Sequence, residues 1–105
     1  MKTTNLVVGQ GVNTTFQVTG SDGNFAPATA YSVSAVISDP TVLAGPSGST
    51  NRLLALKAGT VTIVWTLTPI PGQGYTGAPL VLEAEEFVVN PKVLVSATTS
   101  YSPPS

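Results

Sequence analysis

The strongest constraint on this chain is a stretch after Gly59 in which apolar and polar residues alternate. Successive side chains of an extended strand point to opposite faces, so alternation at period two places the apolar residues on one face. One face of this stretch carries Val61, Ile63, Trp65 and Leu67, while the other carries mainly the threonines at positions 60, 62, 66 and 68. The pattern predicts a half-buried β-strand with Trp65 in the core.

Further short runs of the same kind occur along the chain, separated by Gly, Pro, Asn and Asp. Tyr31–Ser38 alternates in this way, and Asp39-Pro40 ends the run because proline cannot donate a ladder hydrogen bond. No stretch shows the spacing of three and four that an amphipathic helix requires. We therefore expect an all-β fold, a sandwich of about seven strands, with further strands at residues 5–8, 12–19, 42–43, 52–57 and 80–90.

Two of these expected strands carry additional signals. In the segment 12–19, Phe16 and Val18 share one face. In the segment 80–90, the alternation changes phase near Glu85-Glu86-Phe87, which predicts a bulge that inserts one residue.

The segments between the runs are typical of turns and loops. Ser21-Asp22-Gly23-Asn24 predicts a turn, because Asp and Asn bond their own backbone and Gly supplies positive φ. Gly45–Asn51 and the Pro/Gly-rich segment Pro69–Pro79 predict exposed loops. We expect residues 1–91 to form one domain and residues 92–105 to form a short edge strand at Val93–Val95 followed by a Ser/Thr/Pro-rich arm.

Composition excludes several classes of partner. The 105 residues are 42% hydrophobic and only 9% charged, with four cations and a net charge of −1. Such a chain has no basic stripe with which to bind a phosphate backbone, so we expect no nucleic-acid partner. No window is apolar enough for a membrane span, and the absence of cysteine means that packing must hold the fold together.

Two segments carry a family resemblance. They are Ser38-Asp39-Pro40-Thr41-Val42-Leu43-Ala44 and Leu54–Ile63, in which Ala55, Gly59, Thr60, Thr62 and Ile63 match an A-x-x-x-G-T-A-T-I corner. Together they resemble the bacterial immunoglobulin-like group 2 domain. The chain departs from that family at Val36-Ile37, where a tryptophan is usual, and in its longer loop from Pro69. The resemblance implies an immunoglobulin-like sandwich and transfers no chemistry.

Domains that resemble this one are found in bacterial surface adhesins and in bacteriophage tail and capsid proteins. The chain begins with Met1, shows no signal peptide and has no internal repeat, which favours a small virion protein made in the cytoplasm of a bacterial host. We expect it to decorate a capsid at the virion surface, with the major capsid or another virion protein as partner and a homotrimer as its assembly state. The alternative is an adhesin or phage-tail module that binds carbohydrate or protein on the host surface.

The sequence predicts no catalytic, cofactor or metal site. The chain contains no histidine and no cysteine, the usual general base and strong nucleophile. Glu83 and Glu85 would share one strand face about 7 Å apart, but an outward-facing, solubilising acidic patch is the far commoner arrangement of such residues and is the one we expect. Asp22 and Asn24 resemble the start of a calcium loop whose later ligands are missing. For sugar stacking, only Tyr75 and Tyr101 are expected to be exposed, because Tyr31 and Trp65 fall on inward faces.

Overall fold

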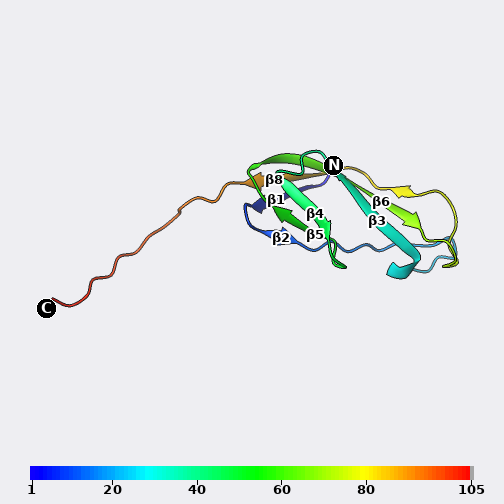
Figure 1. Ribbon diagram of the computed structural model, residues 1–105, viewed down its shortest axis with the longest axis horizontal. Coiled ribbons are helices and arrows are strands. Elements are labelled where there is room, and N and C mark those ends of the chain that lie inside the picture. Colours follow the sequence, from blue (N-terminus) through cyan, green and yellow to red (C-terminus); the bar gives the residue numbers. More distant parts are fainter. Residues whose placement is uncertain (105) are drawn as a thin grey trace.

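Eight strands form two sheets in the computed structural model, which describes residues 1–104 (Figure 1). The larger sheet has the order β1-β8-β6-β3, and β7 pairs with the end of β6. Strand β1 runs parallel to β8, whereas the other pairs are antiparallel. Its strands are β1 (Thr3–Val7), β3 (Tyr31–Ile37), β6 (Gly59–Pro69), β7 (Leu80–Val81) and β8 (Glu85–Asn90).

The smaller sheet has three antiparallel strands in the order β2-β5-β4. They are β2 (Gly11–Val12), β4 (Leu43–Ser47) and β5 (Arg52–Ala55). The one helical element among residues 1–104 is a single 3-10 turn, η1 (Ala28–Ala30), just before β3. No helix in this part of the chain is long and apolar enough to cross a membrane. The all-β prediction is confirmed, and the two sheets form a sandwich-like arrangement.

The alternation after Gly59 has the predicted consequence. Val61, Ile63, Trp65 and Leu67 of β6 are all buried, and Trp65 is only 2% exposed. Strand β3 alternates in the same way, with half-buried residues facing the smaller sheet and exposed residues between them. The side-chain period of a strand therefore sets which residues of both strands enter the core.

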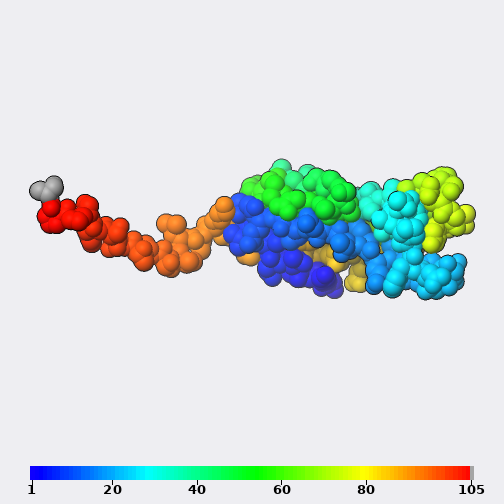
Figure 2. All heavy atoms as spheres, turned by 90° about the horizontal axis from the view of Figure 1, so that it is seen from below, coloured from blue at the N-terminus to red at the C-terminus, as the bar shows by residue number. Residues whose placement is uncertain are grey.

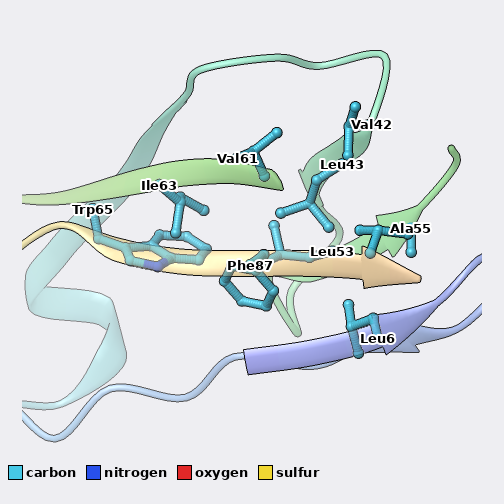
Figure 3. Packing of buried hydrophobic residues seen from close by; sticks show 10 residues of the cluster. Leu6, Val42, Leu43, Leu53, Ala55, Val61, Ile63, Trp65 and Phe87 are labelled. Carbon is cyan, nitrogen blue, oxygen red and sulfur yellow. The ribbon is translucent and has the colours of Figure 1, made fainter. Parts of the chain in front are cut away.

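The core lies between the two sheets and is entirely apolar (Figure 3). Leu43 and Leu53 of the smaller sheet pack opposite Ile63 and Trp65 of β6, and each is nearly inaccessible to solvent. Removing a side chain of this size from water contributes about 1.5–3 kcal/mol. Phe16 packs edge-on against Trp65, with ring centroids 5.1 Å apart, although Phe16 lies outside any strand.

The strand expected at residues 12–19 is shorter than predicted. Strand β2 ends at Val12, and the segment that follows contains no strand, although Phe16 and Val18 still face inward and the alternate residues Thr15, Gln17 and Thr19 are exposed. The physical reason is the length of its neighbour, because β5 begins only at Arg52. After the N–H of Thr14 bonds the carbonyl of Thr50, no strand lies beside the segment on that side.

The expected strand 80–90 divides into β7 and β8. Val81 pairs with Thr66 and Glu85 pairs with Ile63, so the three residues Leu82–Ala84 lie opposite only two residues of β6. One residue is thus inserted, as the phase change predicted, but it lies before Glu85 and interrupts the strand. The N–H of Leu82 still bonds the carbonyl of Trp65.

Two other predicted boundaries differ from the structure. The segment predicted as a loop from Gly45 belongs to β4 as far as Ser47, with a register shift after Ala44, and only the turn to β5 is irregular. Val93–Val95 pair with no strand of the described chain. The last residue of the predicted arm, residue 105, lies outside the described residues.

Candidate functional site

The arm, residues 91–104, is the most exposed part of the structure. It continues from the end of β8 and projects away from the sandwich, so that the molecule measures 75 × 27 × 21 Å (Figures 1 and 2). Its apolar side chains have no cover: Val93 is 68% exposed, Leu94 102% and Val95 87%. Tyr101 is also exposed, as predicted. Consecutive uncovered apolar residues are typical of an interaction site.

A groove, here called the side groove, opens on one flank of the sandwich. It has a volume of about 490 Å³ and lies between residues 14–19 and residues 80–85. Trp65 and Leu67 line it from β6, while Leu80 and Leu82 form an exposed apolar rim. The groove forms because residues 14–19 lie over the inner face of the larger sheet but form no strand pairing with it.

The backbone beside the side groove is unpaired. Within residues 1–104, Thr15, Phe16 and Gln17 make no backbone hydrogen bond. Unpaired N–H and C=O groups in a row are a template on which another strand can add. The flank therefore combines a groove, lined by both apolar and polar side chains, with an open backbone edge.

A second cavity, the loop-end pocket, lies at one end of the sandwich and also has a volume of about 490 Å³. Tyr31 and Tyr75 line it together with Asp22 and the Pro/Gly-rich loop. Tyr75 is half-buried here, less exposed than the sequence predicted. An aromatic ring beside a carboxylate in a shallow pocket is chemically suited to a polar ligand such as a sugar.

Asp22 belongs to the predicted turn. Its Oδ1 accepts the N–H of Asn24 at 3.0 Å, and its Oδ2 accepts the Asn24 side-chain amide at 3.4 Å. Both carboxylate oxygens therefore stabilise the turn itself. Among residues 1–104 there is no group of three or more Asp or Glu side chains placed to hold a metal ion.

The glutamates are distributed around the side groove and β8. Glu83 and Glu85 both line the groove, but Glu83 lies in the irregular segment between β7 and β8 and so does not share a strand with Glu85. The amino group of Met1 lies 3.7 Å from Glu83 Oε1, and Glu86 Oε1 accepts the Thr3 hydroxyl at 3.3 Å. Their contacts are those of surface ion pairs and hydrogen bonds.

Asp39 is a carboxyl group whose pKa is shifted from its ordinary value. Its pKa is lowered by the hydrogen bond from the Thr41 hydroxyl, by the bond from the Thr41 N–H and by the charge of Lys57. These bonds, at 2.6 and 3.0 Å, fix the turn that leads from β3 to β4. The shifted group therefore has a structural explanation and lies in neither cavity.

A scan against protein-family models gives no match, and a search of the curated proteins gives none either.

Sequence patterns predicted the inward faces of Phe16 and Val18 but not the groove beside them. A groove depends on how far the neighbouring strands extend, which no pattern within residues 12–19 encodes. The short apolar run at 52–57 was the one available signal, because a strand that short cannot accompany a partner from residue 12 to residue 19.

Proposed function

We propose that this chain is a non-enzymatic binding module with an immunoglobulin-like strand order. In that fold, strands B, E and D share one sheet and strands C, F and G share the other. The order β2-β5-β4 supports the first set, and β3-β6-β8 supports the second. The Ser38–Ala44 and Leu54–Ile63 segments, which resemble the group 2 domain, overlap the start of β4, the end of β5 and the start of β6 in this arrangement.

The proposed role is capsid decoration: the module binds the coat lattice of a bacteriophage from outside and reinforces contacts between coat subunits. The observation that carries this proposal is the arm, whose consecutive apolar residues Val93, Leu94 and Val95 are left in water. Ordering an arm costs conformational entropy, which burial of those side chains against a partner offsets. The partners are a coat or other virion protein and further copies of the chain, and the proposed location is the virion surface after synthesis in the host cytoplasm.

A non-enzymatic role is supported by the side chains present. With no histidine or cysteine in the sequence, a catalytic mechanism would have to use the carboxylates or a lysine. Glu83 and Glu85 line an open groove and Asp22 stabilises a turn, so none of these carboxylates has a general-acid environment of the buried kind.

Co-sedimentation with undecorated phage capsids tests the decoration proposal. The full chain and a chain truncated after Pro91 are compared at a series of concentrations, with circular dichroism to show that both fold. The truncation removes no strand, so we expect an unchanged melting temperature together with the loss of saturable binding. Equal binding by both chains would move the contact to the sandwich and overturn the role of the arm.

The loop-end pocket favours a second candidate, a host-surface module that binds carbohydrate or protein. Tyr31, Tyr75 and Asp22 offer aromatic faces and a carboxylate at the end of the sandwich opposite the arm. If neither chain binds capsids, decoration is wrong and this second candidate replaces it, with the pocket as its proposed contact.

A further inference from the structure

The open edge beside the side groove has a definite direction. In extended chain, the N–H and C=O of one residue point to one side and those of the next residue point to the other. The N–H of Thr14 points toward Thr50, on the side of β5. The backbone groups of Thr15 and Gln17 therefore point away from β5, toward the outer edge of the smaller sheet, where the described chain places no strand.

The groove next to this edge offers apolar surface among polar side chains. Trp65 and Leu67 line its floor, and Leu80 and Leu82 remain exposed at its rim. A strand added at Thr15–Gln17 would complete the smaller sheet and would direct every second side chain into the groove. The site therefore fits an extended segment with apolar residues at alternate positions.

Residues 92–97 of the arm have that pattern. Val93, Val95 and Ala97 fall on one face of an extended segment, and Leu94 falls on the other with Lys92 and Ser96. Six extended residues span about 20 Å, the length of the segment Thr14–Thr19 that borders the groove. Charge does not oppose this placement, because the face of the arm that would enter the groove carries no charged side chain, while the groove itself contains Glu83, Glu85 and Lys2.

A second copy is the occupant that this geometry favours. The side groove borders Glu85, at the beginning of β8, whereas the arm leaves the sandwich after Asn90, at the opposite end of the same strand. The arm then continues away from its own groove (Figure 2). A copy placed beyond that end would meet the arm without any change in the sandwich.

We propose that residues 92–97 of one copy add a strand to the open edge at Thr15–Gln17 of a second copy and place Val93 and Val95 in its side groove. This inference rests on the proposed role of the arm as a binding element but not on the capsid. Reciprocal exchange between two copies gives a dimer, and exchange in one direction around a ring gives a trimer. In either assembly, the open edge of each copy pairs with the arm of another copy.

Sedimentation velocity of the full chain over a concentration series is the first test. We expect reversible self-association, with a dissociation constant raised more than about tenfold by Val93→Asp with Val95→Asp, since two carboxylates would replace apolar side chains in a groove that already contains Glu83 and Glu85. The matched control is Thr98→Asp with Ser100→Asp, which adds the same charge beyond the pairing segment and should leave association unchanged. Both pairs lie in the exposed arm, so neither affects folding of the sandwich.

Cross-linking identifies the site. Because the natural chain has no cysteine, Gln17→Cys and Leu94→Cys can be made singly, mixed, and treated with a short bis-maleimide. Gln17 and Leu94 both lie on the outward face of the proposed pairing, so we expect a heterodimeric product. Ser34→Cys, exposed on the outer face of β3, replaces Gln17→Cys as the control and should give no product with Leu94→Cys.

Three outcomes would overturn the inference. They are a chain that stays monomeric at every concentration, association that the aspartates do not weaken, and no heterodimeric product from the mixed Gln17→Cys and Leu94→Cys chains. A monomer that still binds capsids through its arm would overturn the exchange alone and leave the decoration proposal standing. Exchange of arms without capsid binding would overturn the decoration proposal and leave the exchange standing.

Discussion

A single carboxylate organises the reversal between the two sheets. Asp39 follows β3, and its Oδ1 accepts both the hydroxyl and the N–H of Thr41, while its own carbonyl accepts the N–H groups of Val42 and Leu43. Such a turn is stabilised by the charged form of the side chain, because an ionised carboxylate is the better acceptor. The lowered pKa of Asp39 is the expected consequence.

We expect this turn to make stability depend on pH. A group whose pKa is lower in the folded chain stabilises that chain above its ordinary pKa, here 3.8, and loses this contribution as the pH falls through the folded-state pKa. Asp39→Ala should therefore lower the urea midpoint at neutral pH, and the difference from the natural chain should shrink well below pH 3.8.

Asp39→Asn is the matched variant, because its amide oxygen can accept the same bonds without a charge. It should fall between the natural chain and Asp39→Ala at neutral pH. A difference between the natural chain and Asp39→Ala that stays constant down to acid pH would refute the electrostatic part of this account.

At the scale of the elements, β4 continues where the sequence indicated a loop. Gly45 has a φ of 126°, and a Cβ at that position would overlap the carbonyl oxygen of Arg52 on β5. The glycine is required by the close approach of two strands, whereas Gly48, with a φ of 67° in the following turn, has nothing within 4 Å of an added Cβ. Glycine is thus required at these two positions for different reasons: close packing of two strands at Gly45, and the positive φ alone at Gly48.

Replacing each of these two glycines with alanine distinguishes the effect of positive φ from the effect of the close strand contact. Gly48→Ala should cost about 1–2 kcal/mol of unfolding free energy, the usual penalty for a left-handed alanine. Gly45→Ala should cost more than about 2 kcal/mol, because the backbone of β5 must also move. Chemical denaturation of the two variants measures the difference, and equal costs would show that β4 and β5 do not approach each other closely at Gly45.

Local patterns predicted the elements whose environment is itself local. The alternation from Val61 to Leu67 identified β6 and its buried face, because a strand between two neighbours in a covered sheet follows its own period. The same pattern at Phe16 and Val18 gave the correct inward face but the wrong extent, since a strand needs a partner along its whole length. Both the side groove and the open edge arise from that missing partner.

At the scale of the whole molecule, the sandwich and the arm treat their apolar residues differently. The sandwich buries one core of apolar residues, while the arm exposes its apolar residues on an extension that makes the molecule almost three times as long as it is wide. The sequence predicted an arm from residue 92, but the side chains that we propose receive it lie on three separated segments, at 14–19, 65–67 and 80–85. Only the fold brings those segments together.

Amide hydrogen exchange on the capsid-bound chain tests the central claim, that the arm is the binding element. Unpaired amides of an exposed arm exchange rapidly, and amides that enter a sheet or an interface are protected. We predict that residues 92–97 become protected on the particle relative to the chain in dilute solution, while β6 is protected in both states. Rapid exchange of residues 92–97 on a particle that has bound the chain would contradict the account.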